Sequence, residues 1–238
     1  DTLACLQAAH RTDYPDFKLL VVDNANLPSL AAALASTACH LIQNPANLGY
    51  AGGNNIGIRW ALAQGSDYVL LLNADMLIEP ATCQNLVSAA QNHPGTAAVG
   101  GKIHPLGEPH LLWSAGEPFP REAPCVPDTP RYDQPRELKY VVGGCMLLSR
   151  AALAAVGLLD EAFFLLHEEK EWCSRALRAG FHIWYTPQAV AWHNLHSSFT
   201  SHRDPAYHYL YVRNNLLFLQ RQGSLRPGWG GLSQAIQF

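Results

Sequence analysis

A chain of 238 residues, 48% of them hydrophobic, is long enough to bury the core of one large globular domain or two small ones. Its formal net charge of −3, with 15% charged residues and no long basic run, disfavours a nucleic-acid partner. Six cysteines without a CxxC pair predict neither a zinc knuckle nor a disulfide framework and fit reduced thiols in a cytosolic protein. No apolar stretch approaches the roughly 20 residues of a membrane-spanning helix, and the first residues show no leader pattern.

Helix-like and strand-like segments alternate along the first half of the chain. A helical stripe at the start precedes a strand at 17–23, and the pattern then predicts a helix at 27–37, strands at 39–44 and 67–73, and a helix at 54–65 between them. The strands are nearly continuous apolar runs, which indicates a mostly parallel α/β sheet covered by helices on both faces. Ligands of such sheets bind outside the carboxyl ends of the strands.

The second half continues with a helix at 78–95 and a strand at 97–103, followed by a proline- and glycine-rich stretch from 104 to 135 that we expect to be irregular. A strand interrupted by glycines at 138–149 and two helices, at 150–157 and from Glu168 to Gly180, come next. A terminal amphipathic helix lies within 204–223. We therefore expect one domain at residues 1–200 and a helical extension at 201–238.

Polar motifs stand at the predicted strand ends. Asp23 can accept hydrogen bonds from a nucleoside, although an ordinary turn explains it equally well. The Gly- and Asn-rich segment 44–57 suits either close backbone approach to a ligand or a capped helix start. Asn73 and Asp75 lie two apart on an extended chain and point the same way, so they can either hold a divalent ion with diphosphate and water or form a turn.

An acidic cluster follows the apolar run at 163–166. Glu168 and Glu169 open a helix, where the helix dipole favours negative charge, and this alone could explain them. Glu171 is spaced to support the helix through Arg175 and Arg178. A carboxylate buried at this point can have its pKa raised enough to accept a proton near neutral pH.

His193 ends a predicted strand, where a histidine is most often structural but can also bind a divalent metal. No HExxH pattern is present, which excludes the common zinc hydrolase signature.

Taken in order, these segments resemble the family-2 glycosyltransferases of the GT-A (Rossmann-like) fold, particularly the bacterial rhamnosyltransferase-like branch. The segments that carry the resemblance are VVDNAN, NPANLGYAGGNNIGI, YVLLLNADMLIEP, GGCMLLSRAALAAVGLLDEAFF, HEEKEWCSRALRAG, WHNLHSSF and YLYVRNNLLFL. The family normally begins with a strand that lines the base pocket. Nothing here corresponds to it, so we expect a break in the sheet at that position and weak nucleotide binding by this chain alone.

The resemblance implies a role for each motif residue. It implies Glu169 as catalytic base with Glu168 beside it, and Mg²⁺ or Mn²⁺ bound by Asp75 with help from His193. The residues implied to contact the nucleotide are Asp23, Asn47, Gly49, Asn54 and Asn73, the last in place of the first aspartate of the family's DxD motif. Those implied to contact the sugar or acceptor are Gly144, Cys145 and Trp172.

The activity implied is inverting transfer of a sugar from a nucleotide diphosphate to a hydroxyl of a glycan or lipid-linked acceptor, in cell-surface polysaccharide synthesis. Rhamnose on dTDP is the first donor expected and UDP-hexoses the second. The resemblance is compatible with a cytoplasmic protein, at the inner face of the membrane or as a homo-oligomer. Two alternatives stay open: a nucleotidyltransferase, and a non-catalytic member that binds glycans or partners.

Overall fold

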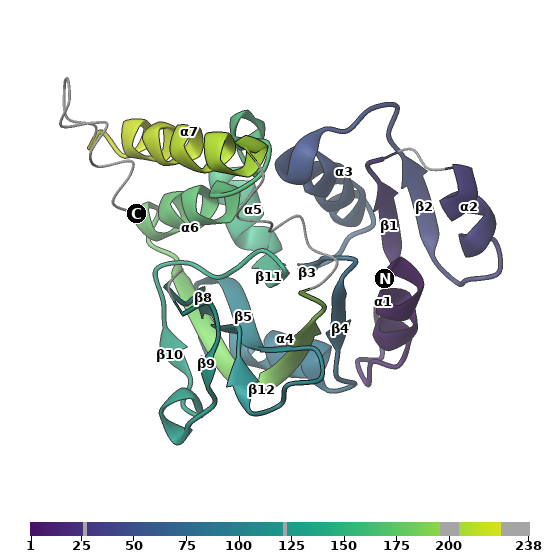
Figure 1. Cartoon of the computed structure of the whole chain (residues 1–238), viewed down its shortest axis with the longest axis horizontal. Coiled ribbons are helices and arrows are strands. Elements are labelled where there is room, and N and C mark those ends of the chain that lie inside the picture. Colours follow the sequence, from purple (N-terminus) through teal and green to yellow (C-terminus); the bar gives the residue numbers. More distant parts are fainter. Residues whose placement is uncertain (26–27, 121–122, 196–204, 225–238) are drawn as a thin grey trace.

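Helices and strands alternate along the chain in the computed structural model, which describes residues 1–25, 28–120, 123–195 and 205–224 (Figure 1). The helices are α1 (Thr2–His10), α2 (Pro28–Leu34), α3 (Gly49–Ala63), α4 (Thr82–Asn92), α5 (Arg150–Val156), α6 (Glu168–Arg178) and α7 (Pro205–Arg221), with the 3-10 turns η1 (Pro130–Tyr132) and η2 (Glu161–Phe163). The strands are β1 (Leu20–Asp23), β2 (His40–Gln43), β3 (Tyr68–Leu72), β4 (Met76–Ile78), β5 (Thr96–Pro105), β6 (Leu111–Leu112), β7 (Ser114–Ala115), β8 (Glu117–Pro118), β9 (Val126–Pro127), β10 (Arg136–Glu137), β11 (Cys145–Ser149) and β12 (His182–His193).

The larger sheet has the order β10-β12-β5-β11-β3, with β4 on β12 and the β7–β8 hairpin on β5. It is mixed, so the expectation of mostly parallel pairing was wrong for this sheet: β5 and β12 are parallel, whereas β11 runs antiparallel to both β3 and β5. The reason is that Cys145 of β11 starts beside Leu72, the last residue of β3. In the described residues between β5 and β11 no helix returns the chain to the other end of the sheet, as a strand parallel to β5 would require.

β1 and β2 pair in parallel as a separate two-stranded sheet. In the described ranges neither strand is hydrogen-bonded to the larger sheet, and Figure 1 shows this pair with α2 to one side of it. The break in the sheet that the sequence predicts is therefore present. Helix α1, also expected, packs against β4, on the side of the β1–β2 pair (Figure 1). The Cys5 thiol donates to the backbone carbonyl of Asn73 (3.5 Å).

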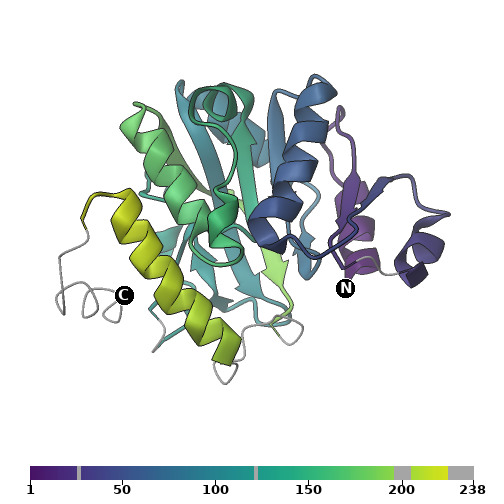
Figure 2. The ribbon, with the colours of Figure 1, turned by 90° about the horizontal axis from the view of Figure 1, so that it is seen from above.

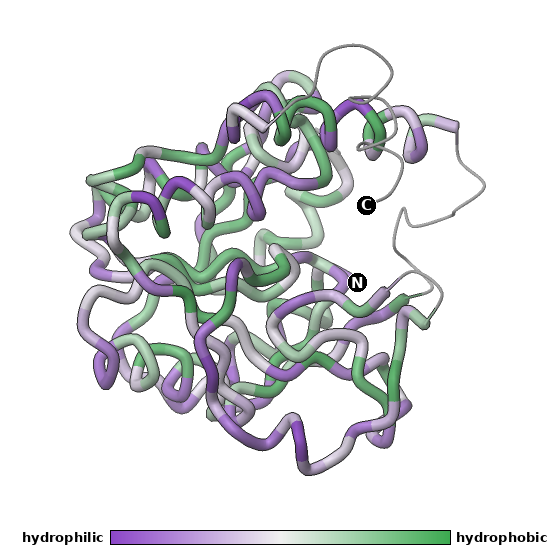
Figure 3. Tube along the Cα trace, turned by 90° about the vertical axis from the view of Figure 1, so that its left-hand side faces the viewer, coloured by the Kyte–Doolittle hydropathy of each residue, from purple (hydrophilic) through white to green (hydrophobic). Residues whose placement is uncertain are grey.

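Two apolar layers cover the larger sheet. On one face α4 buries Leu86 and Val87 against β5, and on the other α5 and α6 bury Leu153 and Trp172. Strand β5 is buried over its whole length, as expected for a continuous apolar strand between two helical layers. In Figure 3 hydrophobic and hydrophilic stretches alternate along the trace, and many of the hydrophilic ones lie at its outer edge.

The stretch predicted as irregular contains the short strands β6 to β9 and the turn η1. The ammonium of Lys102 on β5 ties it down by ion pairs to Asp128 (3.0 Å) and Asp133 (2.7 Å). The predicted amphipathic helix is α7, which lies alongside α6 (Figures 1 and 2). The proposed domain boundary at residues 200 and 201 lies outside the described residues. None of the described helices combines the length and apolarity needed to cross a membrane.

Candidate active site

The end of β1 and the start of α3 are joined by a network of side-chain amides. Asp23 is buried (4% exposed), and its carboxylate accepts hydrogen bonds from the Ala25 amide and from Gln43 (both 3.1 Å). The side-chain oxygen Oδ1 of Asn24 accepts hydrogen bonds from the Asn44 side chain (2.9 Å) and from the backbone amide of Leu48 (3.1 Å). Its amide donates to the loop before α3. These bonds hold the β1 end and the 44–49 loop in one arrangement.

Gly49 lies where α3 meets the loop that precedes the acidic cluster. Its φ is +71°, and a Cβ there would lie 2.4 Å from the Phe164 carbonyl oxygen. The Tyr50 and Ala51 amides donate to that same oxygen (2.5 and 3.3 Å). Only glycine permits this approach, so the first turn of α3 is fastened to Phe164.

Asp75 and His193 converge from different strands. His193 Nε2 lies 3.3 Å from Asp75 Oδ2, and the Asn194 amide donates to the Asp75 carbonyl (2.9 Å), so the end of β12 is held against the turn after β3. The edge of the Trp113 ring packs on the His193 imidazole (4.4 Å between centroids). A carboxylate oxygen and an imidazole nitrogen fit Mg²⁺ or Mn²⁺ if diphosphate and water fill the other positions. Among the described residues no group of three or more His, Cys, Asp or Glu is arranged so that it could hold a metal ion, so substrate oxygens would have to complete such a site.

Asn73 lies next to this pair. Its backbone amide donates to the Gly144 carbonyl (3.0 Å). Its side-chain nitrogen lies 3.9 Å from the position that a Cβ on Gly144 would take. The turn after β3 and the start of β11 are therefore adjacent, which brings Asn73, Asp75 and Gly144 to one end of the sheet.

The acidic pair follows a strained backbone. Phe164, Leu166 and His167 have φ of 62°, 76° and 74°, the left-handed region that side chains other than glycine rarely adopt. Glu168 is 3% exposed and Glu169 half-buried. Within the described part of the chain, the Oε2 atom of each is buried and has no hydrogen-bond partner. Such atoms are rare in native proteins and often mark functional sites.

Burial raises the pKa of both carboxyls. For Glu168 the pKa lies well above its ordinary value, first because of burial and then because of the charge on Glu169. For Glu169 burial also raises the pKa, while a backbone hydrogen bond, the Glu168 side chain and the Lys170 ammonium oppose the rise. Glu169 is therefore the first of the two to ionise.

Tyr50 links the acidic pair to the glycines before β11. Its hydroxyl donates to the Gly143 carbonyl (2.6 Å), and a Cβ on Gly143 would lie 2.5 Å from that hydroxyl. Burial, followed by the charges of Glu168 and Glu169, raises the pKa of Tyr50 well above its ordinary value, which keeps it a neutral donor. The ring thus lies near the carboxylates and holds Gly143.

Comparison with known proteins identifies the family. Residues 1–157 match the family model described as glycosyl transferase family 2. The chain belongs to this family. A mannosyltransferase from Pyrobaculum calidifontis, solved with GDP-Man and Mn²⁺, superposes with a TM-score of 0.62 and 18% identity over 98% of this chain and 64% of its own. At that identity the likeness shows the fold, GT-A, as expected from the sequence.

Two curated relatives are similar over most of the chain. The low-salt glycan biosynthesis hexosyltransferase Agl10 of Haloferax volcanii is 29% identical over 84% of this chain and 66% of its own length. The N-acetylglucosaminyl-diphospho-decaprenol L-rhamnosyltransferase of Mycobacterium tuberculosis is 27% identical over 89% of this chain and 76% of its own. The family-2 domain described here therefore spans about two thirds to three quarters of these relatives.

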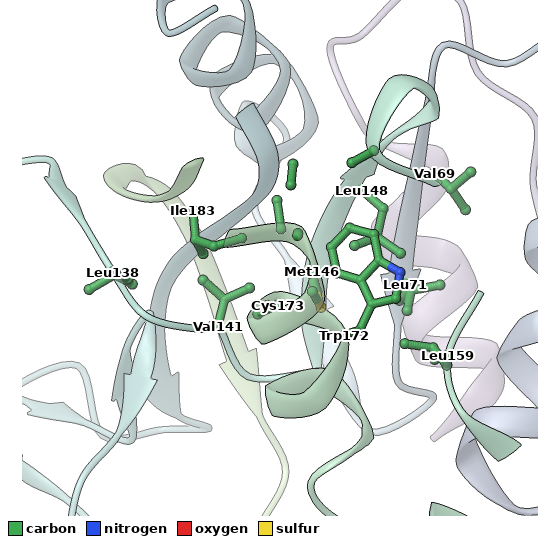
Figure 4. Packing of buried hydrophobic residues seen from close by; sticks show 14 of the residues in the cluster. Val69, Leu71, Leu138, Val141, Met146, Leu148, Leu159, Trp172, Cys173 and Ile183 are labelled. Carbon is green, nitrogen blue, oxygen red and sulfur yellow. The ribbon is translucent and has the colours of Figure 1, made fainter. Parts of the chain in front are cut away.

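Some side chains implied by the family resemblance are committed elsewhere. Trp172 is fully buried and donates to the Gly157 carbonyl (2.8 Å), and Figure 4 shows its indole among Met146, Leu148 and other core side chains, so it is not available to a sugar. Burial raises the pKa of the Cys145 thiol to about 12, and the side chain belongs to the core. The expectation that these two side chains contact the sugar does not hold, because both are packed among apolar side chains and neither is exposed.

Two asparagines are also used locally. The Asn47 side-chain oxygen accepts from Asn24 (3.0 Å) and from the Gly49 amide (2.9 Å), and the Asn54 side chain donates to the Tyr50 carbonyl (3.0 Å). Their structural role is to shape the loop and the first turn of α3. Asn24 and Tyr50 themselves were missed from the sequence. For Asn24 a signal existed, because two amide-bearing residues follow Asp23 at a strand end.

Proposed function

We propose that this protein transfers a sugar, with inversion, from a nucleotide diphosphate donor to a hydroxyl of a glycan or lipid-linked acceptor. The observation that carries the proposal is the buried acidic pair, whose unpartnered Oε2 atoms lie at the start of α6. A carboxylate held in a poorly solvated site, with its pKa raised toward neutrality, is suited to removing a proton from a hydroxyl.

Glu169 is proposed as the base and Glu168 as its protonated neighbour. Burial and the Glu169 charge act together to raise the pKa of Glu168 well above its ordinary value. The rise in the pKa of Glu169 is opposed by a backbone hydrogen bond, by the Glu168 side chain and by the Lys170 charge, so we assign the negative charge of the pair to Glu169. As the acceptor oxygen attacks the anomeric carbon, its proton passes to Glu169, and the diphosphate leaves from the opposite face.

Asp75 and His193 are proposed to hold Mg²⁺ or Mn²⁺ with the diphosphate of the donor. The metal, when bound, neutralises the charge that develops on the departing diphosphate. Asn73 and Gly144 lie beside this pair and would line the space for the donor. We propose that the nucleotide pocket is shaped by Asp23, Asn47, Gly49 and Asn54. The last three act by fixing the backbone of the loop and of the first turn of α3.

The relatives guide the choice of substrates to test. The mycobacterial relative is named for rhamnosyl transfer to a lipid-linked diphosphate sugar, and the archaeal one for hexosyl transfer in glycan biosynthesis. We propose dTDP-rhamnose as first donor and UDP-hexoses as second, with a lipid-linked acceptor met at the inner face of the membrane in the cytoplasm.

The decisive experiment compares Glu169→Gln with Glu168→Gln in a transfer assay with these donors, Mn²⁺ and a lipid-linked acceptor analogue. Donor concentrations should reach the millimolar range, because weak nucleotide binding is expected. We expect Glu169→Gln to lower kcat by on the order of 10²-fold or more, with little change in donor KM. Glu108→Gln, which removes one exposed charge, is the matched control. Full turnover by Glu169→Gln would remove Glu169 from the mechanism.

A further inference from the structure

The segment before the acidic pair holds an unfavourable backbone. Three of the four residues from Phe164 to His167 have positive φ without being glycine, and His167 is the residue from which α6 starts. Such conformations persist only where surrounding contacts impose them. The contacts of this segment therefore determine where Glu168 and Glu169 point.

Those contacts come from α7. The side-chain nitrogen of Asn214, which is fully buried, lies within hydrogen-bond distance of three backbone carbonyls, those of Phe163 (2.8 Å), Leu165 (2.6 Å) and Leu166 (2.7 Å). Its two N–H groups are thus shared among three acceptors in the strained segment. Because the three carbonyls converge on one nitrogen, the backbone must curl around it.

The Asn214 amide is itself oriented. Arg213 Nη1 donates to the side-chain oxygen of Asn214 (3.0 Å), which leaves the Asn214 nitrogen to face the carbonyls. Arg213 Nη2 donates to the Ala162 carbonyl (2.5 Å). Farther along α7, Arg221 pairs with Asp160 (2.9 Å). Helix α7 therefore grips the segment from Asp160 to Leu166 at several points, with Asn214 at its centre.

The other side of the segment carries the α3 contact. The Phe164 carbonyl accepts from the Tyr50 and Ala51 amides, and Tyr50 in turn holds Gly143. A shift of Phe164 would move the acidic pair and release the first turn of α3 together.

We propose that Asn214 is a positioning residue for the acidic pair: by clamping the carbonyls of Phe163, Leu165 and Leu166 it maintains the left-handed segment that aims Glu168 and Glu169 at the acceptor. The inference rests on the proposed function for its catalytic meaning. It adds a residue of α7 that acts through the backbone of the segment from Phe163 to Leu166.

The test uses Asn214→Asp, which keeps the size of the side chain and the Arg213 contact but removes both donors. Arg213→Ala, which frees the amide to rotate, is a milder second variant that keeps the measurement possible should the first not fold. The control is Tyr185→Phe, which removes another buried side-chain donor to a backbone carbonyl (Tyr132, 2.8 Å), near the start of β12. Each protein is examined by amide hydrogen exchange and by steady-state kinetics.

We expect the Tyr50 and Ala51 amides to lose at least tenfold protection from exchange in Asn214→Asp, more than in Tyr185→Phe. We expect kcat to fall about 10²-fold, the scale of a misplaced catalytic group, with donor KM within about threefold of wild type. Leu166→Gly, which tolerates φ of +76°, should recover part of kcat in the Asn214→Asp background.

Unchanged protection at Tyr50 and Ala51, or a loss of kcat no greater than that of Tyr185→Phe, would overturn the role of Asn214. The two proposals fail separately. A wild-type protein that transfers no sugar contradicts the proposed function, while the exchange measurement still decides whether Asn214 fixes the segment.

Discussion

Gly49 offers the sharpest test of how the site is assembled. In Gly49→Ala the new side chain must occupy the left-handed region, which costs roughly 1–2 kcal/mol. Its Cβ would also lie 2.4 Å from the Phe164 carbonyl oxygen, so α3 and Phe164 must separate. The bonds from the Tyr50 and Ala51 amides then weaken, at about 0.5–1.5 kcal/mol each. The free energy of unfolding should fall by about 2–5 kcal/mol in total, which lowers Tm by roughly 4–20 °C for a chain of this size.

The matched control is Gly65→Ala. Gly65 has φ of +85°, and apart from its own chain neighbours no heavy atom among the described residues lies within 4 Å of the position that a Cβ would take. It therefore carries the backbone cost alone, about 1–2 kcal/mol. Thermal and urea unfolding of the two variants separate the close approach from the backbone strain. Equal Tm values for the two variants would refute the reasoning, because the contact with Phe164 would then contribute nothing.

Two further predictions concern the charged groups. Because burial raises the pKa of Glu168 above its ordinary 4.5, this carboxyl contributes its full stability only below that pH and loses it as pH rises through the folded value. The free energy of unfolding of Glu168→Gln, measured with urea relative to that of wild type, should therefore be higher at pH 8 than at pH 5. An equal difference between the two proteins at both pH values would contradict the raised pKa. Asp75→Asn should abolish the extra thermal stabilisation that Mn²⁺ adds to a nucleoside diphosphate, with Mn²⁺ alone as the control; full retention of that stabilisation would remove Asp75 from the metal site.

The elements with strong periodicity could be predicted from the sequence. The strands before Asp23 and Asn73, the helix at 168–178 and the terminal helix all occur, because continuous apolar runs and a 3.6-residue stripe are local properties. The pair formed by Glu171 and Arg175, both Oε atoms 2.9 Å from Nε, was predicted by the same helical spacing. Strand direction was not predictable in the same way, since β11 depends on where the long excursion after β5 returns to the sheet.

In the candidate site, the motif residues could likewise be predicted from the sequence, whereas roles that depend on tertiary packing could not. Motif residues such as Asp75 and His193, which are 118 positions apart, do meet. The burial of Trp172 could not be read from its helix, because it depends on packing with residues of other strands. Asn214 left a faint signal in the sequence. Two consecutive asparagines are poor helix formers in the middle of an amphipathic helix, which indicates a role other than helix formation.

The hold of α7 on the 160–166 segment has a consequence for synthesis. During translation the residues of the acidic pair emerge well before Asn214, so a nascent chain contains every motif of the site while its strained segment still lacks the clamp. If Asn214 has the proposed role, the proposed sugar-transfer centre would be completed only when α7 docks, and a product terminated before residue 214 would lack the contacts that position the acidic pair. On this proposal, activity would depend on the synthesis of a helix that lies more than thirty residues after the acidic pair.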